Sequence, residues 1–365
     1  MNKKIGTTGN EAAALAIKQI NPEVIAAYPI TPTTQIMETL ADYEAKGDYN
    51  GQIILVESEH SAMSATVAAS LSGARAMTAT ASQGLALMNE VLHIASGLFT
   101  PITMVVGARA LSAPINIHND HSDVMSVLDS GWIQFYAETV QDVYDFIIQA
   151  VKISENPKLQ IPSMVIMDGF ITTHEFTNIE IMSDSKVQKF VGKYQPIDSL
   201  LDFENPKTIG GFALPDVYSE TKNAQSKRMK KVKSIIKMVA NQYQKITDRG
   251  FKFLEIDNPK AKKMIVAQAS VCGTIREAIK NNSKVGLCKI NLFRPFPDQE
   301  IINALSDSKE IIVVDRANSF DSIGGPVYKE IRAALFGKSN AKITNHILGL
   351  GGKNISILDI KKIIK

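Results

Sequence analysis

The chain has 365 residues, of which 45% are hydrophobic and 21% charged, and its formal net charge is +3. At roughly 150 residues per domain, this length and composition predict a globular protein with two or three domains. The small charge and the lack of an aromatic-interleaved basic stripe argue against a nucleic-acid partner, and no run of about eighteen apolar residues could span a bilayer.

Cysteine usage narrows the possible metal sites. The two cysteines, Cys272 and Cys288, have no CxxC spacing, which excludes a four-cysteine zinc or iron–sulfur site made by this chain alone. We interpret both as small core residues. So few thiols, and an N-terminus without the long apolar core of a signal peptide, predict a cytoplasmic protein.

Short apolar strands alternate with helices over residues 1–190, which predicts an α/β domain with a parallel sheet buried on both faces. Strands are expected at residues 23–30, 51–58, 75–82, 101–109 and 161–170. Helices are expected at residues 6–20, 31–47, 59–73, 83–99 and 139–155.

Residues 191–258 lose the strand pattern and form a predicted linker, with one long charged helix at residues 220–246. We interpret its basic cluster as a solvated helix face, because an apolar stripe runs along the same helix. The alternation resumes at residues 259–365, which predicts a second α/β domain. Its strands are expected at residues 262–270, 284–292, 310–316 and 345–352, and its helices at residues 273–281, 298–308, 324–336 and 356–364.

Polar residues follow the C-terminal ends of the predicted strands, where open parallel sheets bind their ligands. In chain order they are Thr31, Glu59 with His60, Gln83 with Gly84, Arg109, the loop 116–123, and Thr172 to His174. Several strands therefore end in groups that could converge at one edge of the sheet.

Thr31 lies between Pro29 and Pro32, where a strand gives way to a helix. We expect Thr31 to be the helix N-cap and Pro32 to occupy the first helical position, where a missing N–H costs nothing. In a functional alternative, the hydroxyl at this helix start faces an anion.

Glu59 lies at the next helix start, with Ser58 as a plausible cap, and Glu57 precedes it by two residues. The helix dipole alone favours a carboxylate there, but an acid at this place could also share a proton with a ligand nitrogen. The spacing does not choose between the two acids. Arg109 is equally consistent with a structural ion pair and with binding a carboxylate or phosphate.

The loop 116–123 contains His118, Asp120, His121 and Asp123. These are metal-ligand residue types, but their spacing matches no common zinc motif, so we expect a polar loop network. The sequence has no GxGxxG after a strand and no Walker loop. It therefore does not indicate a dinucleotide-binding or P-loop site.

Two sets of motifs carry a resemblance to a known family. In the first domain they are YPITPTTQ, the run 56–90, GARALSAP, DHSD and MDGFITTHE; in the second they are KINLFRPFP, VVDRANSF and GGPVYKEI. Together they resemble alpha subunits of the 2-oxoacid:ferredoxin oxidoreductases, most closely the pyruvate:ferredoxin oxidoreductase (pyruvate synthase) type. The resemblance implies a pyrimidine-type thiamine-diphosphate-binding domain, a helical linker and a transketolase C-terminal-like α/β domain.

The activity implied by the resemblance is the reversible oxidative decarboxylation of pyruvate to acetyl-CoA and CO2, with electrons passed to ferredoxin or flavodoxin. Thiamine diphosphate would be shared with a beta subunit, and coenzyme A would be a co-substrate. Mg2+ and 4Fe-4S clusters would lie on beta, gamma and delta-type partners, which agrees with the few cysteines and the missing GDG…N motif. The chain would be active only with these partners.

The resemblance also implies site roles. The glutamate of the family's SE step falls on Glu59, which would face N1′ of the thiamine aminopyrimidine. Thr31 matches a substrate-contacting threonine, and Arg109 matches the arginine that binds the substrate carboxylate. In the family, small residues are commoner after this glutamate, whereas this chain has SEHSAM. His60 therefore lies beside the key acid, without an assigned role. A 2-oxoisovalerate or 2-oxoglutarate enzyme and a non-catalytic scaffold subunit remain as alternatives.

Overall fold

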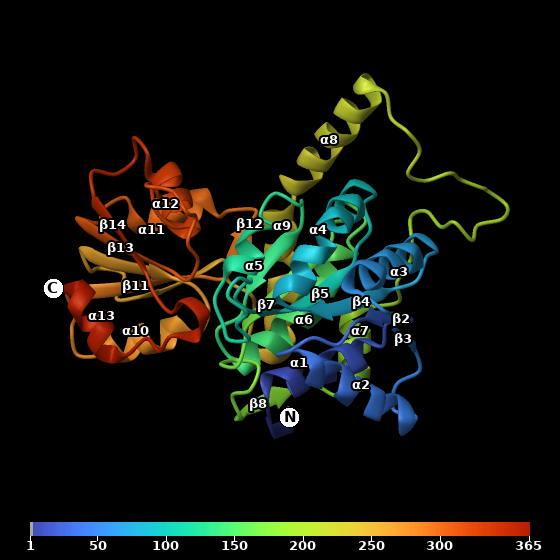
Figure 1. Ribbon diagram of the computed structural model, residues 1–365, viewed down its shortest axis with the longest axis horizontal. Coiled ribbons are helices and arrows are strands. Elements are labelled where there is room, and N and C mark those ends of the chain that lie inside the picture. The colour runs from blue at the N-terminus through green and yellow to red at the C-terminus, as the bar shows by residue number, and fades with distance from the viewer. Residues whose placement is uncertain (1–2) are drawn as a thin grey trace.

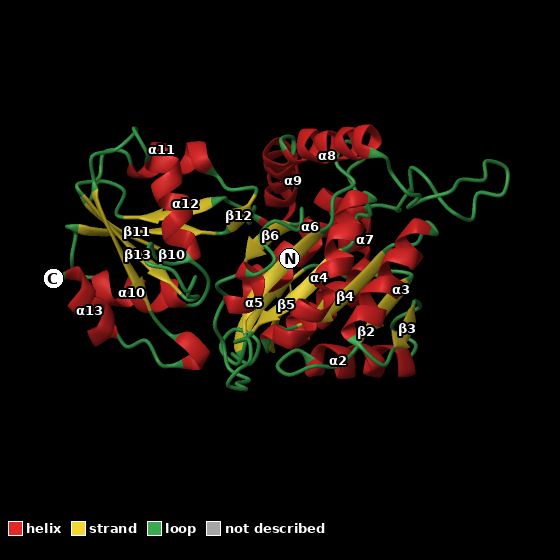
Figure 2. Cartoon of the chain, turned by 45° about the horizontal axis from the view of Figure 1, so that its top comes forward, coloured by secondary structure: helices red, strands yellow, loops and turns green. Residues whose placement is uncertain are grey.

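A seven-stranded sheet dominates the first part of the chain in the computed structural model, which describes residues 3–365 (Figures 1 and 2). In spatial order its strands are β12 (Leu292–Arg294), β6 (Ile133–Tyr136), β7 (Ser163–Asp168), β5 (Thr103–Ala108), β4 (Ala76–Thr80), β2 (Val24–Ala27) and β3 (Gln52–Leu55). All neighbours are parallel except β12, which is antiparallel to β6. The carboxyl ends of the parallel strands therefore meet at one edge.

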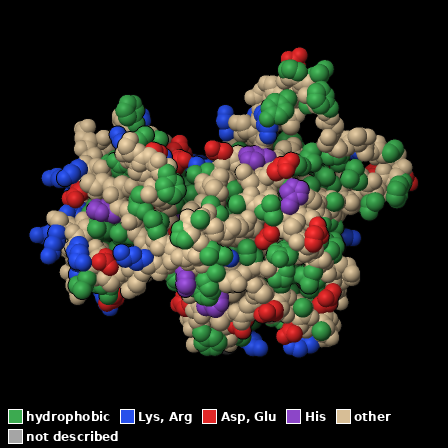
Figure 3. All heavy atoms as spheres, in the orientation of Figure 1, with side chains coloured by type: hydrophobic (Ala, Val, Ile, Leu, Met, Phe, Trp, Pro, Cys, Tyr) green, Lys and Arg blue, Asp and Glu red, His purple; other side chains and the backbone are tan. Residues whose placement is uncertain are grey.

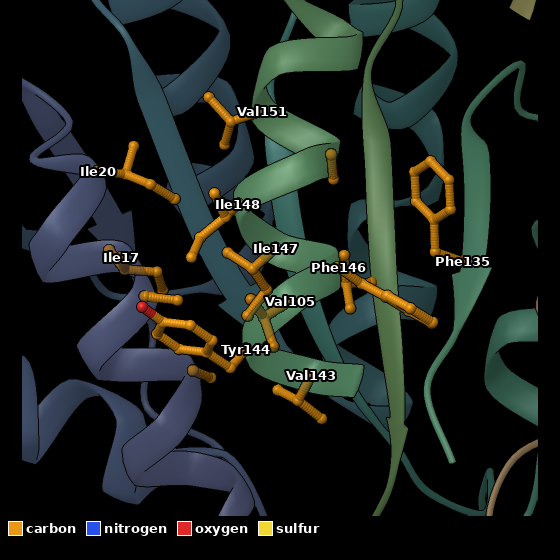
Figure 4. Close-up of a cluster of buried hydrophobic side chains, with 14 of the residues drawn as sticks. Ile17, Ile20, Val105, Phe135, Val143, Tyr144, Phe146, Ile147, Ile148 and Val151 are labelled. Carbon is orange, nitrogen blue, oxygen red and sulfur yellow. The ribbon is translucent and has the colours of Figure 1, made fainter. Parts of the chain in front are cut away.

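Helices cover both faces of this sheet, as the apolar strands require. One face carries α1 (Gly9–Ile20), α2 (Thr34–Ala45), α6 (Val140–Ser154), α7 (Asp184–Val191) and α9 (Val232–Thr247). The other face carries α3 (Glu59–Leu71), α4 (Ser82–Gly97) and α5 (Ser122–Met125). Figure 4 shows Tyr144 and Ile148 of α6 beside Ile17 and Ile20 of α1, in the core of the first face.

A five-stranded sheet forms the last part of the chain. Its strands, in spatial order, are β14 (Lys342–Ile347), β13 (Glu310–Asp315), β10 (Lys263–Ala267), β11 (Val285–Ile290) and β9 (Leu254–Asp257), of which only β9 is antiparallel to its neighbour. Its helices are α10 (Val271–Ile279), α11 (Asp298–Leu305), α12 (Pro326–Leu335), α13 (Ile357–Ile364) and the 3-10 turn η1 (Leu350–Gly352). One apolar cluster joins both parts, because it contains Leu92 and Trp132 as well as Ile311 and Val313.

The predicted linker 191–258 is not a bare connector. The single helix expected at 220–246 is two helices, α8 (Pro215–Met229) and α9, which are separated at Lys230 and Lys231. The apolar stripe belongs to α9, and the Tyr243 hydroxyl of α9 donates a hydrogen bond of 2.6 Å to Asp145 in α6. Strand β9 joins the second sheet. The division of the chain at residues 190 and 258 stays a prediction.

A projecting arm consists of the loop 193–214 and α8 (Figure 1). α8 buries none of its residues. Figure 3 shows hydrophobic side chains on this projection. Its exposed large apolar side chains include Leu201, Phe203, Phe212, Leu214 and Tyr218.

Five strands are absent from the sequence-based assignment: β9 and β12, described above, and β1, β6 and β8. β1 (Lys3–Thr7) and β8 (Thr177–Ile181) pair with each other in a separate antiparallel ribbon, and β6 lies inside the main sheet. β1 and β8 are partly exposed and carry no continuous apolar run, so their pattern is weak. Among residues 3–365, no helix has both the length and the apolar character needed to cross a membrane.

Helix starts around the sheet edge confirm one predicted cap and correct another. α3 begins at Glu59, and the Ser58 hydroxyl accepts a hydrogen bond of 3.2 Å from the Ser61 N–H, as expected of an N-cap. The N-cap predicted at Thr31 is wrong, because α2 begins only at Thr34. A turn precedes it, closed by the Thr33 hydroxyl, which donates to the Ile30 carbonyl at 2.9 Å.

Candidate active site

Glu59 is largely buried at the sheet edge, and its carboxyl has no protein partner among residues 3–365. Glu59 is only 7% exposed, and within residues 3–365 neither of its carboxyl oxygens takes part in a hydrogen bond or ion pair. A Cβ added to Gly84, on the first turn of α4, would lie 2.7 Å from Glu59 Oε1 and 2.5 Å from the Thr80 hydroxyl. Glycine at this position therefore lets the Glu59 and Thr80 side chains pack directly against the start of α4.

The Thr80 hydroxyl, at the end of β4, is also buried and without a hydrogen-bond partner in the described part of the chain. Buried polar groups normally find a partner, so the unpaired Thr80 hydroxyl close to the unpaired Glu59 carboxyl indicates a place for a polar ligand. Glu57, the second acid that the spacing allowed as the functional carboxyl, is exposed. The Ser61 hydroxyl donates to Glu57 and lowers its carboxyl pKa, so Glu57 already has a structural partner.

Arg109 and Thr31 lie in contact at the ends of β5 and β2. The guanidinium of Arg109 donates from Nη1 to the Thr31 carbonyl at 2.8 Å and from Nε to the Asn116 carbonyl at 2.9 Å. Arg109 is 6% exposed, and burial lowers its pKa from the ordinary value. No acidic side chain among residues 3–365 forms an ion pair with it, so most of its donors are free to bind an anion.

Asp123 joins the ends of β4 and β5. Its Oδ2 accepts hydrogen bonds from the backbone N–H groups of Ser82, at 2.8 Å, and Arg109, at 3.0 Å. Burial raises the pKa of Asp123 to about 7, against the effect of these N–H donors. The Asp123 carboxyl therefore links the start of α4 to the backbone of Arg109.

The loop 116–123 forms the polar network expected from its composition. Asp120 accepts from the Ser122 N–H and hydroxyl at 2.9 and 2.6 Å. His121 Nε2 lies 2.8 Å from Asp168 Oδ1. Over the range 3–365, no cluster of three or more histidine, cysteine or acidic side chains is arranged to hold a metal ion.

Asp168, at the end of β7, also binds the second domain. It accepts hydrogen bonds from Arg316 Nη1 at 2.8 Å, from the Ser270 N–H at 3.1 Å and from the Ser270 hydroxyl. Burial raises the pKa of Asp168, but the charges of Arg316 and His121 outweigh this and hold it well below the usual range. Both Asp168 and Arg316 end apolar strand runs, the same signal that singled out Arg109.

Among the other sequence candidates, Gln83 accepts a hydrogen bond from the Ser82 hydroxyl at 2.6 Å, and its Nε2 is buried without a partner in residues 3–365. His60 lies on the surface, with Nε2 at 3.5 Å from the Glu90 carboxylate. The Thr172 hydroxyl donates to the Glu138 carbonyl at 3.1 Å, and the Thr173 hydroxyl accepts from the Phe170 N–H at 2.7 Å. His60 therefore does not touch the Glu59 carboxyl in this chain.

Both cysteines are buried free thiols, as predicted. Burial raises the pKa of Cys288 to about 12 and that of Cys272 well above its ordinary value. A thiol at these positions is an inert core side chain.

The family described as "Pyruvate flavodoxin/ferredoxin oxidoreductase, thiamine diP-bdg" matches residues 15–241, and "Pyruvate:ferredoxin oxidoreductase core domain II" matches residues 261–360. The chain is 45% identical to "Pyruvate synthase subunit PorA" of Methanocaldococcus jannaschii, over 98% of this chain and 93% of that protein. It is 39% identical to "Ketoisovalerate oxidoreductase subunit VorA" of Pyrococcus abyssi, over 99% of this chain and 92% of that one.

Two solved structures share the fold. One is "2-oxoglutarate:ferredoxin oxidoreductase from Magnetococcus marinus with 2-oxoglutarate, coenzyme A and succinyl-CoA bound", with a TM-score of 0.76 at 19% identity, over 100% of this chain and 66% of that one. The other is "Split gene transketolase, inactive beta4 tetramer", with a TM-score of 0.58 at 10% identity, over 99% of this chain and 97% of that one. The predicted α/β fold class is confirmed.

Proposed function

Because the chain belongs to the pyruvate flavodoxin/ferredoxin oxidoreductase family, we propose that it is the thiamine-facing subunit of a pyruvate:ferredoxin oxidoreductase. The enzyme would convert pyruvate and coenzyme A to acetyl-CoA and CO2, in either direction, and pass electrons to ferredoxin or flavodoxin. Higher identity to the pyruvate synthase subunit than to the ketoisovalerate subunit supports pyruvate as the substrate.

The single observation that carries this proposal is the unpaired carboxyl of the largely buried Glu59, which packs against Gly84. It fits the aminopyrimidine of thiamine diphosphate, because a carboxyl with no protein partner can hold a proton against a ring nitrogen. Glu59 would bind N1′ and control its protonation. When bound, thiamine diphosphate supplies the electron sink that allows a 2-oxoacid to lose carbon dioxide.

Arg109 would bind the substrate carboxylate. Its guanidinium is fixed at Nε and Nη1 by two carbonyl groups, and the remaining N–H groups have no acidic partner in residues 3–365. A planar fork of this kind matches a carboxylate in a two-point contact. Thr31 follows the C-terminal end of β2 and contacts Arg109 through its backbone carbonyl, and the residue is exposed. We assign the Thr31 hydroxyl to the 2-oxo group of the substrate.

Other chains would complete the enzyme. The sequence has no GDG…N motif and only two cysteines, so the Mg2+–diphosphate site and the iron–sulfur clusters would lie on beta, gamma and delta-type partners, with the whole complex in the cytoplasm. Exposed apolar side chains on the projecting arm, such as Phe203 and Phe212, support assembly with another chain, because monomeric proteins rarely expose such patches.

The function is tested by purifying the assembled complex and measuring coenzyme A-dependent reduction of a viologen dye with several 2-oxoacids. We expect the highest kcat/KM for pyruvate. A higher value for 2-oxoisovalerate or 2-oxoglutarate would reassign the substrate, which a few apolar contacts worth roughly 1–3 kcal/mol can decide. An intact complex that reduces the dye with none of the 2-oxoacids would indicate a scaffold subunit.

A further inference from the structure

The loop that follows Arg109 is held by a turn of the second domain. The Asn116 amide donates from Nδ2 to the Gly351 carbonyl at 2.9 Å. In return, the Gly351 N–H donates to Asp120 Oδ2 at 3.1 Å, and the Gly352 N–H donates to the Asn119 carbonyl at 2.6 Å. The 3-10 turn η1 is therefore hydrogen-bonded to both ends of the segment 116–120, which lies more than two hundred residues away in the sequence.

Asn116 connects this turn to the substrate-binding arginine. Its backbone carbonyl accepts the hydrogen bond from Arg109 Nε at 2.9 Å, and its side-chain Oδ1 accepts from the His118 N–H at 2.7 Å. The side chains of its two neighbours do not anchor the loop in the core, since Ile115 is 80% and Ile117 40% exposed. The side chain of Asn116 is therefore the anchor that fixes the carbonyl facing Arg109.

The Asn116 carbonyl sets the direction of the guanidinium. Nη1 is held by the Thr31 carbonyl and Nε by the Asn116 carbonyl. Two acceptors define the plane of the fork, whereas a single acceptor would let it rotate. A small rotation would turn the free N–H groups away from a bound carboxylate, and binding sites are sensitive to errors of this size.

We propose that Asn116 and the Gly351 turn are positioning elements for Arg109, so that the second domain sets the affinity of the site for the substrate carboxylate. The proposal rests on the proposed function of Arg109. It assigns to the second domain a direct part in 2-oxoacid recognition, although none of its residues needs to touch the substrate.

Gly351 offers a matched pair of variants. Its φ is +58°, and an added Cβ would lie 2.5 Å from Asn116 Nδ2. Gly337, in the same domain, has φ +65° and no atom within 4 Å of an added Cβ. Alanine strains the backbone similarly at both positions, but only Gly351→Ala pushes on Asn116. Gly337→Ala therefore controls for strain in the second domain.

The experiment measures steady-state kinetics of the assembled enzyme carrying Asn116→Ala, Gly351→Ala or Gly337→Ala. We expect the first two to raise the KM for pyruvate by roughly tenfold, with the KM for coenzyme A and the kcat at saturating pyruvate unchanged. Gly337→Ala should leave all three values within twofold of wild type. A uniform loss of kcat and of both affinities would mean that the loop has only a structural role.

A variant with both Asn116→Ala and Gly351→Ala tests whether the two residues act on the pyruvate KM through the same contact. Asn116→Ala removes the atom that Gly351→Ala would push on, so the double variant should have the same pyruvate KM as Asn116→Ala alone. If the pyruvate KM of the double variant rose by the product of the two single-variant factors, the residues would act independently, and the proposal would be overturned. This cycle remains informative if either single variant is less stable.

Arg109→Gln distinguishes the two possible failures. If Arg109→Gln raises the pyruvate KM strongly and the Asn116 and Gly351 variants do not, the positioning proposal is wrong and the role of Arg109 stands. If Arg109→Gln leaves the pyruvate KM unchanged, the carboxylate-binding role is wrong, and the positioning proposal falls with it.

Discussion

At the scale of single residues, the candidate site consists of polar groups that the protein leaves unsatisfied. Glu59 and the guanidinium of Arg109 are both buried and lack partners of opposite charge among residues 3–365. The cofactor ring nitrogen would give Glu59 a partner and the substrate carboxylate would give Arg109 one, so we propose both residues for the site.

The sequence located these residues because the carboxyl ends of parallel strands meet at one edge. Spacing alone could not distinguish Glu57 from Glu59, since both lie beside the same helix start; only the family resemblance pointed to Glu59. The role that we propose for Asn116 could not be predicted from the sequence, for another reason. Its partner, Gly351, comes from a distant turn, and no local pattern reports a contact between two loops.

Thr31→Val tests the substrate contact at this scale. The Thr31 side chain is exposed and makes no hydrogen bond to residues 3–365, and it does not cap α2. We therefore expect a change in unfolding free energy within about 0.5 kcal/mol and a pyruvate KM several-fold higher, measured with the viologen assay. Unchanged kinetics would leave Thr31 only as the backbone acceptor for Arg109.

At the scale of elements, a helix start holds Glu59 in place. α3 presents Glu59 at its first turn because Ser58 caps it. The sequence predicted this cap correctly, since Ser58 directly precedes an alanine-rich helix. It misplaced the start of α2, because the turn at residues 30–33 is closed by Thr33 and by a contact to Arg109 from another strand. Tertiary contacts of this kind override local propensity.

Ser58→Ala tests the role of this cap. Loss of the hydrogen bond to the Ser61 N–H should lower the unfolding free energy by about 1 kcal/mol, measured by urea titration. Ser183→Ala is the matched control, because Ser183 is the N-cap residue of α7 but makes no side-chain cap bond. Equal effects of the two variants would show that the Ser58 hydroxyl does not stabilise α3.

At the scale of the whole molecule, the two α/β parts are joined by a polar network as well as by a shared apolar cluster. The sequence predicted both sheets, because their core strands are continuous apolar runs. It did not predict that β12, from the predicted second domain, joins the first sheet, since three residues carry no periodicity. The polar network lies at the same edge as the candidate site.

Asp168→Asn tests the hydrogen-bond network between the two α/β parts and the pH dependence of the stability that it provides. Removing a buried charge that faces Arg316 should cost roughly 3–5 kcal/mol of unfolding free energy near pH 7. The folded-state pKa of Asp168 is lowered, so its stabilisation is full above the unfolded pKa of about 3.9 and is lost as pH falls below it. Urea titrations should show the wild type and the variant converging below about pH 4, and a constant difference down to pH 2 would contradict this.

The central claim is that the Glu59 carboxyl activates the bound thiamine ring. The most direct measurement is the exchange rate of the C2 proton of thiamine diphosphate in the assembled enzyme, followed by NMR after acid quench. Glu59→Gln keeps the size of the side chain and removes its acid, so we expect the rate to fall by roughly 10²–10⁴-fold. Glu57→Gln, at the exposed acid two residues away, should stay within twofold of wild type. An unchanged exchange rate in Glu59→Gln would contradict the account.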